Sequence, residues 1–461
     1  METPMNPAAQ LHGVRTPTDH LSVSPQDELV IEGCAASELI ARFGSPLYAI
    51  SEATLRANYR RVHATFKQLW PQPINLLYAI KANTTLAVRA ILHQEGAGGD
   101  CFGEGELHAT FRAGADPSRV ALNGSNKSYA DLRRAADLGV MINIDAEDEI
   151  DIVSELARDL GTELRVGLRL KCFTPQYGDQ QTDYFSPTGG LAEYVRGVKW
   201  GFSVDAAEPL VRRLSVLPGI AFRGFHFHIG RASQNPGFQR RWASALADSV
   251  IELNRRTGFV PTLLDVGGGW ARQRDPESRS LALNPHAIDM YATAACETLR
   301  MRFEEAGIAL PELWIEPGRY IIGNAVTLLG TVGAIKRDLG RTWVNVDFST
   351  NNLPRIDTSG SVYHVLAASE MQRAFTETVT IVGPTCIDSV IGTDRRMPVL
   401  RRDEPIAVLD AGMYAESAST QFNSLPRPAT VLVNGADAEI VKERETVTDI
   451  FSNHRIPQRL G

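Results

Sequence analysis

Residues 74–96, INLLYAIKANTTLAVRAILHQEG, contain a short and largely apolar run, a lysine directly after it, and then an amphipathic stretch. A run of four to eight apolar residues is typical of a buried strand, and apolar residues three and four apart are typical of a helix. The same succession recurs across residues 51–323. Strand-like runs that alternate with helix-like stretches predict βα units, whose strands pair in parallel.

Residues whose side chains or backbone groups can react or bind a ligand come directly after most of these predicted strands. They are, in chain order, Lys81, Asn123, His226, His228, Gly267 to Gly269 and Glu316. Reactive groups at the carboxyl ends of successive parallel strands are typical of the active face of a (β/α)8 barrel. We therefore expect an α/β fold in which residues 51–324 form a TIM-type barrel. An open, doubly wound sheet is the competing layout.

The sequence pattern differs in the rest of the chain. From residue 325 onward, short β-rich runs such as TVTIVGP and ATVLVNG are separated by Gly, Pro and Asp. This pattern predicts a β-rich, sandwich-like or barrel-like C-terminal domain over residues 325–461. Residues 29–50 contain a strand, a short helix and another strand that could join that domain. Residues 1–28, rich in Pro, Thr and Ser, are expected to form a flexible leader.

The composition is that of a globular protein. Hydrophobic residues make up 43% of the 461 residues and charged residues 22%, and the net charge is −7. A negative net charge gives no bulk attraction to nucleic acid or to anionic lipid. With neither a signal-peptide pattern nor a membrane-spanning stretch, we expect a cytoplasmic protein. Five scattered cysteines without a CxxC pair predict free thiols and no metal site.

Two motifs in the barrel region suggest a phosphorylated cofactor. Lys81 ends a buried strand, where desolvation lowers the pKa of a lysine and frees its amine for a Schiff base; a lysine that simply reaches solvent is the alternative. Gly267, Gly268 and Gly269 follow another strand, and their bare N–H groups can close on a phosphate. A tight turn explains three glycines almost as well. Because a GxGxxG pattern is absent, a single phosphate is implied.

Two further motifs suggest a flat, nitrogen-containing ring. Glu316 at a strand end can hold a proton on a heteroaromatic nitrogen, and Arg319 can pair with an anion, although a structural Glu–Arg pair is equally open. His226 and His228 lie on one face of a strand. Zinc ligation lacks a third ligand at a suitable spacing, so one ring stacked on a cofactor fits better. The other histidine is then a core residue.

The C-terminal region adds Cys386, whose thiol can donate a proton, and Tyr414, whose hydroxyl can bind phosphate. Each alone suits a structural role. Joint occurrence is more informative, since a strand-end lysine, a glycine loop, a carboxylate and an imidazole together describe a pocket for pyridoxal 5'-phosphate (PLP) at a barrel mouth.

From about residue 29 to residue 460, this ordered motif set resembles the fold-type III PLP-dependent decarboxylases. The diaminopimelate decarboxylase branch is the more similar and ornithine decarboxylase the more distant. The resemblance implies that Lys81 carries the cofactor, that Glu316 pairs with the ring nitrogen and that His228 stacks on the ring. It implies further cofactor-binding positions at Asp100, Asn123, Arg169, Gly267, Gly268, Gly269 and Tyr414.

The resemblance also implies a reaction and an assembly. An amino acid would lose its α-carboxylate as CO2, and Cys386 or Lys81 would return a proton to the α-carbon. In the family, the cysteine crosses the interface of a head-to-tail dimer to reach the partner's site. A homodimer with shared active sites follows, with Cys386 as the proton donor and a small amino acid as the substrate.

Substrate choice is where the sequence departs from the branch. The branch usually has Cys-Glu-Ser, whose Glu receives the distal ammonium of meso-diaminopimelate, whereas Cys386 is followed here by Ile387 and Asp388. An apolar side chain cannot neutralise that charge, and Asp388 could do so only if the loop shifts.

Arginines mark the other end of the substrate. Arg355 matches the arginine that grips the distal carboxylate, and Arg319 and Tyr414 are further candidates for substrate binding. The family tyrosine four residues after Arg355 is Ser359, and Arg231 replaces a serine of the phosphate-side motif. Arg231 could bind an anion or point to solvent. Conversion of meso-diaminopimelate to lysine is therefore implied, with decarboxylation of a conjugated or anionic amino acid in a specialised pathway as the alternative.

Two other functions remain to be weighed. An amino-acid racemase of the alanine racemase type shares the barrel and the lysine, but in that family an arginine faces the ring nitrogen, and Glu316 disfavours it. Some decarboxylase homologues act as regulatory binding proteins after losing catalytic residues. Lys81, Glu316 and Cys386 are all present here, which favours an enzyme.

Overall fold

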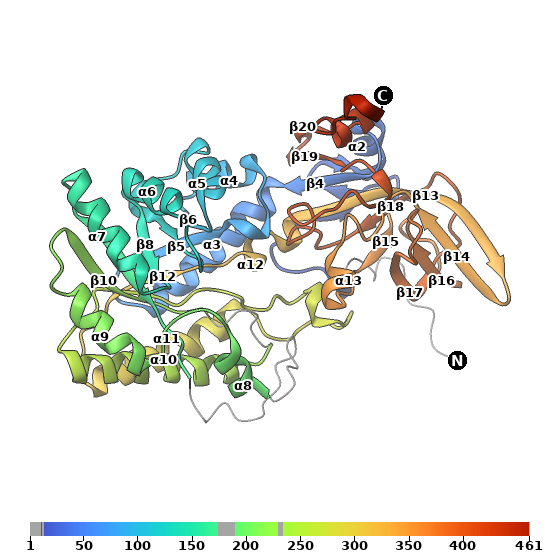
Figure 1. Cartoon of the computed structure of the whole chain (residues 1–461). Helices are drawn as coiled ribbons and strands as arrows, with labels where there is room; N and C mark the ends of the chain where they lie inside the picture. The colour runs from blue at the N-terminus through green and yellow to red at the C-terminus, as the bar shows by residue number, and fades with distance from the viewer. Residues whose placement is uncertain (1–10, 12, 174–189, 229–233, 461) are drawn as a thin grey trace. The chain divides into compact units, whose positions relative to one another are not determined.

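The computed structural model describes residues 11, 13–173, 190–228 and 234–460 (Figure 1). The chain divides into two compact units. The barrel unit comprises Asn58–Gln273 and Asn284–Ile321, and the sheet unit comprises Met1–Ala57, Arg274–Leu283 and Ile322–Gly461.

The barrel unit is built on eight parallel strands that close on themselves. In chain order they are β5 (Ile74–Ala79), β6 (Gly98–Cys101), β7 (Val120–Leu122), β8 (Met141–Ile144), β9 (Leu164–Arg169), β10 (Ile220–His226), β11 (Leu263–Asp265) and β12 (Glu312–Ile315). Closure follows from the pairing of β12 with β5 and of β10 with β9. The predicted TIM-type barrel is confirmed, and the open doubly wound sheet is excluded.

Helices alternate with these strands (Figure 1). They are α3 (Glu52–Leu69), which begins in the sheet unit, α4 (Leu86–Gln94), α5 (Glu104–Arg112), α6 (Tyr129–Leu138), α7 (Asp148–Leu160), α8 (Gly190–Gly197), α9 (Val204–Leu214), α10 (Pro236–Thr257), α11 (Ile288–Glu305) and α12 (Arg319–Ile322). Local sequence sets their ends: Ser128 and Asp131 form a capping box at the start of α6, and Gly139 ends that helix in the left-handed conformation. No described helix is long and apolar enough to cross a membrane.

The barrel interior is filled rather than hollow. Five buried side chains from different strands form one apolar cluster: Leu77, Ala121, Met141, Leu263 and Trp314. A packed interior leaves room for ligands only at the rim, so the residues that follow the strands face the accessible end.

The sheet unit contains a nine-stranded sheet. Its strands are β4 (Leu47–Ser51), β13 (Val326–Asp338), β14 (Arg341–Val346), β15 (Val365–Ala367), β16 (Glu377–Val382), β17 (Val390–Met397), β18 (Pro405–Val408), β19 (Ala429–Asn434) and β20 (Asp437–Lys442). Strand β4 precedes the barrel in sequence, yet it pairs with β13 and with β19. Two short helices, α13 (Arg355–Ser359) and α14 (Val447–Phe451), also lie in this unit. The predicted C-terminal β-rich region is confirmed.

The N-terminal segment adds a small sheet of β1 (Leu21–Val23), β2 (Leu29–Ile31) and β3 (Cys34–Ala35), followed by α2 (Ala36–Phe43). Leu21 and Leu29 are buried in an apolar cluster, and buried Asp19 pairs with Arg274 at 2.8 Å. Part of the expected flexible leader is therefore folded, because its apolar side chains have a core to enter. Residues 1–10 and 12 lie outside the described residues.

Candidate active site

Four neighbouring strands of the barrel present a polar residue at the same end. Arg169 ends β9 and is paired in register with His226, which ends β10, and His226 is paired with Asp265 at the end of β11. Glu316 directly follows β12. All four side chains are buried, and Asp265 is completely inaccessible. Closure of the barrel thus gathers residues up to 147 positions apart, Arg169 and Glu316, into one rim.

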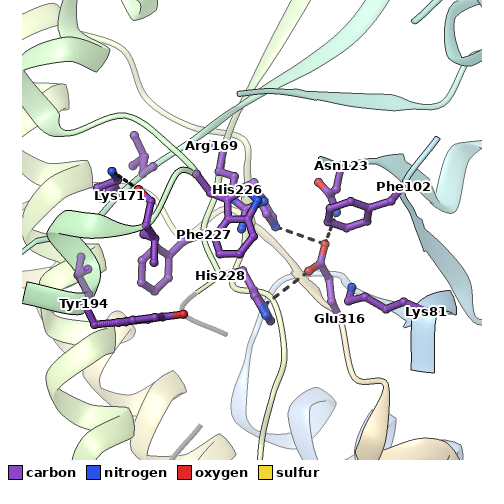
Figure 2. A pocket seen from close by; sticks show the side chains of 14 residues that line it. Lys81, Phe102, Asn123, Arg169, Lys171, Tyr194, His226, Phe227, His228 and Glu316 are labelled. Atoms are coloured by element: carbon purple, nitrogen blue, oxygen red, sulfur yellow. Dashed lines mark hydrogen bonds and ion pairs between the residues drawn. The ribbon is translucent and has the colours of Figure 1, made fainter. Parts of the chain in front are cut away.

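A cavity of about 330 Å³ opens at this rim. Its polar lining includes Lys81, Asn123, Arg169, Lys171, His226, His228 and Glu316. Figure 2 shows Asn123, His226 and His228 directed at the Glu316 carboxylate. The apolar lining includes Phe102 and, from the segment around α8, Tyr194 and Trp200. Sequence reasoning missed these aromatic residues because nothing in their spacing marks them as neighbours of the strand ends.

The Lys81 ammonium forms an ion pair and is not enclosed by apolar side chains. Its Nζ pairs with Asp100 of β6 and lies 4.9 Å from the centre of the Phe102 ring. The Lys81 side chain is 37% exposed, whereas that of Asp100 is fully buried. The expectation of a desolvated lysine is therefore wrong: the amine stands at the open side of the cavity, and the Asp100 charge stabilises its ammonium form.

Asn123 joins the two carboxylates of the site. Its Nδ2 donates to Glu316 Oε1 at 2.6 Å and to Asp100 Oδ1 at 2.7 Å, and its Oδ1 accepts from Asn143 Nδ2 at 2.7 Å. Asn143 lies on β8 and was not among the sequence candidates. A lone asparagine within the apolar strand MINI was the signal that could have found it, because buried amides require partners.

Both histidines are neutral near physiological pH. Burial lowers the pKa of His228 to about 3 and holds the pKa of His226 well below its ordinary value. His226 Nε2 lies 3.4 Å from Glu316 Oε1, and His228 Nδ1 accepts a hydrogen bond from the Gly268 N–H at 3.2 Å. The spacing along the chain showed no third ligand for the two histidines, and in the folded chain two carboxylates accompany one of them, His226. Ligand atoms of His226, Asp265 and Glu316 lie within 4.8 Å of one another, a proximity that spacing along the chain could not reveal.

The glycine loop after β11 is required by close packing. A Cβ at Gly267, where φ is +66°, would lie 2.4 Å from His228 Nδ1, and a Cβ at Gly268 would lie 2.0 Å from the Glu316 carbonyl oxygen. The Gly267 N–H donates to Asp265 Oδ1 at 2.9 Å. With the Gly268 N–H already bound to His228, two of the three N–H groups expected to hold a phosphate serve the barrel itself. The Gly269 N–H has no recorded partner among the described residues.

The remaining candidates lie largely in the sheet unit. Cys386 and Asp388 are exposed on the loop after β16, where the Cys386 N–H donates to Asn423 Oδ1 at 2.9 Å. Tyr414 has a φ of +54°, which is uncommon for a bulky residue. The Arg355 guanidinium lies 5.3 Å from the centre of the Tyr414 ring.

Arg355 already has an acidic partner in this unit. Its Nε donates to Glu277 Oε1 at 2.6 Å, and Glu277 is buried. In the barrel unit, Arg319 begins α12 and is buried, and its carbonyl accepts from Arg272. Arg231 and the neighbouring Ser233 lie outside the described residues.

The donor set in the barrel fits PLP. The cavity combines a lysine amine for an aldehyde, a carboxylate for a ring nitrogen and a neutral imidazole for a flat ring, beside a loop whose Gly269 N–H can meet an anion. Its volume of about 330 Å³ lies within the usual range for small-molecule sites.

Comparisons with known proteins agree with this chemistry. Residues 54–323 match the model of the pyridoxal binding domain of pyridoxal-dependent decarboxylases. A diaminopimelate decarboxylase of Methanothermobacter thermautotrophicus is 33% identical over 95% of this chain and 98% of that protein. One of Pseudomonas aeruginosa is 32% identical over 93% of this chain and 97% of that protein.

Solved structures share the fold. The crystal structure of a diaminopimelate decarboxylase from M. jannaschii has a TM-score of 0.87 at 24% identity, and the alignment covers 96% of this chain and 99% of that one. The family match spans more than half of the chain, and the relatives span nearly all of it. The chain therefore belongs to the pyridoxal-dependent decarboxylases and is a PLP-dependent amino-acid decarboxylase.

Proposed function

We propose that this enzyme removes one α-carboxylate of meso-diaminopimelate as CO2 and releases lysine. One observation carries the catalytic part: a single polar network joins Lys81 to Glu316 through the buried Asp100 and Asn123. The substrate is supported by the relatives named diaminopimelate decarboxylases, which are 28–33% identical over most of the chain.

In the proposed site, the Lys81 amine would hold the cofactor through its aldehyde. When bound, PLP supplies an electron sink for the negative charge that the departing carboxylate leaves on the α-carbon. Glu316 accepts a hydrogen bond from the protonated ring nitrogen and keeps that proton in place. His228 is neutral, so it can cover the ring without adding a competing positive charge.

The phosphate requires separate donors. We propose that the Gly269 N–H, with the adjoining glycines shaping the loop, is joined by Tyr414, while Asp100, Asn123 and Arg169 line the cofactor's remaining edges. Arg319 is proposed to bind an anionic group of the substrate. In this assignment Asp100 neutralises the Lys81 ammonium of the cofactor-free enzyme.

A homodimer in the cytoplasm is the proposed assembly and location. Cys386 is exposed and its thiol is free, as a residue that reaches a partner's site would have to be. The other four cysteines are also free, which is typical of a reducing compartment. In the proposed dimer, Cys386 returns the proton to the α-carbon in the partner's cavity.

A second substrate is favoured by the Arg355–Glu277 pair. An arginine that is already neutralised by a buried carboxylate attracts a distal carboxylate weakly. Ile387, which is 46% exposed, offers no charge for a distal ammonium. Both features suit a conjugated amino acid whose distal end is masked, processed in a specialised pathway.

Release of CO2 from the PLP-loaded enzyme separates these possibilities. The panel comprises meso-diaminopimelate, D- and L-lysine, D- and L-ornithine, L-arginine, L-glutamate and diaminopropionate acylated on its side-chain amine. Rapid conversion of meso-diaminopimelate to lysine supports the first proposal. Turnover of an acylated substrate alone supports the second, and CO2 release from none of the panel contradicts both.

A further inference from the structure

Asp265 and Glu316 are two buried carboxylates in direct proximity. Asp265 is 0% exposed and Glu316 is 4% exposed. One oxygen of each carboxylate and a ring nitrogen of His226 lie within 4.8 Å of one another. Asp265 Oδ1 accepts from the Gly267 N–H, but Oδ2 has no hydrogen-bond donor among the described residues. An inaccessible carboxylate oxygen without a donor is costly if the group is ionised.

The cations around this pair are already engaged. Lys81 pairs with Asp100, and Arg169 Nη1 lies 3.8 Å from Asp145 Oδ2. The other titratable groups that face the pair are Asp100, which adds a negative charge, and His226 and His228, which burial keeps neutral. Arg169 also acts on Glu316, Asp100 and Asp265, so two cations, Lys81 and Arg169, face the four carboxylates of Asp100, Asp145, Asp265 and Glu316. With more buried carboxylates than cations, the adjacent Asp265 and Glu316 cannot both stay ionised, so the pair must hold a proton.

We infer that Asp265 keeps this proton and uses it to donate a hydrogen bond to Glu316, which makes Asp265 a positioning residue for the carboxylate that faces the cofactor's ring nitrogen. The inference deepens the proposed function and rests on it for the role of Glu316. The number of donors decides which group is ionised. Glu316 Oε1 accepts from Asn123 at 2.6 Å, whereas Asp265 accepts only from a backbone N–H.

Electrostatics support the same assignment. Burial, followed by the neighbouring Glu316 charge, raises the pKa of Asp265 well above its ordinary value. A protonated ring nitrogen would compensate one carboxylate, Glu316, and the site would still contain one carboxylate more than it contains cations. Asp265 thus stays protonated in the loaded enzyme, and its O–H fixes the orientation of Glu316 from behind the cofactor.

The proton can be observed without any turnover. In the cofactor-free full-length protein near neutral pH, an infrared difference spectrum of wild type minus Asp265→Asn should contain the carbonyl band of a protonated carboxyl group. Asp19→Asn is the matched control: Asp19 is also buried, but Arg274 compensates its charge, so its difference spectrum should lack this band. Absence of the band for Asp265 overturns the inference and leaves the proposed reaction untouched.

Two substitutions then test the positioning role. Asn keeps an acceptor for the Gly267 N–H and a donor toward Glu316, so Asp265→Asn should bind PLP within about threefold of wild type, whereas Asp265→Ala should weaken binding about 10- to 100-fold, as the loss of an outer partner typically does. Binding is read from the absorbance change on PLP titration, with circular dichroism checking that both variants fold. Equal damage by both variants would show that an ionised Asp265 is needed.

Two other outcomes also overturn the inference. If Asp265→Ala binds PLP as wild type does, Asp265 positions nothing. If elemental analysis of the purified enzyme finds one equivalent of a transition metal that is lost in both Asp265→Asn and Asp265→Ala, the cluster of His226, Asp265 and Glu316 is a metal site and not a shared-proton pair.

Discussion

At the residue scale, Lys81 is the position on which the proposed covalent chemistry depends. Lys81→Ala should lower turnover by at least about 1,000-fold and remove the absorbance band of protein-linked PLP, because no other amine occupies its place. Lys171 also lines the cavity, but its Nζ donates to the Val198 carbonyl at 2.5 Å, so Lys171→Met should keep the band. Decarboxylation at an undiminished rate by Lys81→Ala would remove Lys81 from the mechanism.

Asp19 is a residue whose contribution to stability should depend on pH. Burial alone would raise the pKa of Asp19, but Arg274 and the Thr16 N–H outweigh it and leave the pKa below the ordinary 3.8. The contribution is therefore full above about pH 4 and is lost as the pH falls through the lowered pKa. Asp19→Asn should reduce the free energy of unfolding by about 3 kcal/mol near neutral pH.

The check on Asp19 is the difference in unfolding free energy between wild type and Asp19→Asn, measured at several pH values. The difference should narrow as the pH falls below about 4 and should vanish below the lowered pKa of Asp19, where both proteins carry a neutral side chain. A difference that is equally large at low and neutral pH would mean that the charge of Asp19 does not stabilise the fold.

At the scale of elements, the barrel was predictable because most of its strands are short, largely apolar runs followed by a polar residue, although β6, with the sequence GGDC, is not. Lys81, His226 and Glu316 stood out for that reason. Contacts between strand ends were not predictable, since register and barrel closure decide them. Asn143 on β8 donates to Asn123, and Asp265 on β11 lies close to Glu316. A pattern along the chain reveals neither contact.

The loop after β11 provides a prediction about packing between elements. In Gly268→Ala, a Cβ would lie 2.0 Å from the Glu316 carbonyl oxygen, a backbone atom that can move only with the end of β12. The displacement should carry Glu316 out of position and weaken PLP binding at least about tenfold. Titration of the apoprotein with PLP measures the effect.

Gly105→Ala is the control for Gly268→Ala. Gly105 lies on α5, and a Cβ there meets nothing within 4 Å. Gly105→Ala should leave PLP affinity unchanged and stabilise the protein by up to about 1 kcal/mol, because alanine is the better helix former. If Gly268→Ala binds PLP as well as Gly105→Ala does, close packing is not what the loop requires.

At the scale of the whole molecule, the sequence predicted that residues 29–50 join the C-terminal β-rich domain, and the structure confirms it, but the strands that pair were not predictable. Strand β4 joins β13 and β19, which lie more than 270 residues later, so the sheet unit is assembled from both ends of the chain. The apolar runs predicted β structure, but nothing in a run states its partner. Substrate preference could not be predicted from the sequence for a related reason: Arg355 pairs with Glu277, and the sequence does not show that these two residues are in contact.

The proposed shared active site predicts that two inactive variants regain activity when they form mixed dimers. Cys386→Ala should keep the PLP absorbance and lose most turnover, because the exposed thiol would act in the partner's cavity. Inactive Lys81→Ala and Cys386→Ala chains, mixed and allowed to exchange, should then recover about a quarter of wild-type activity, since each mixed dimer of a twofold assembly contains one intact site. Native mass spectrometry confirms that mixed dimers form, and mixing Lys81→Ala with itself is the control. Mixed dimers that form without regaining activity would mean that each chain supplies both residues to its own site.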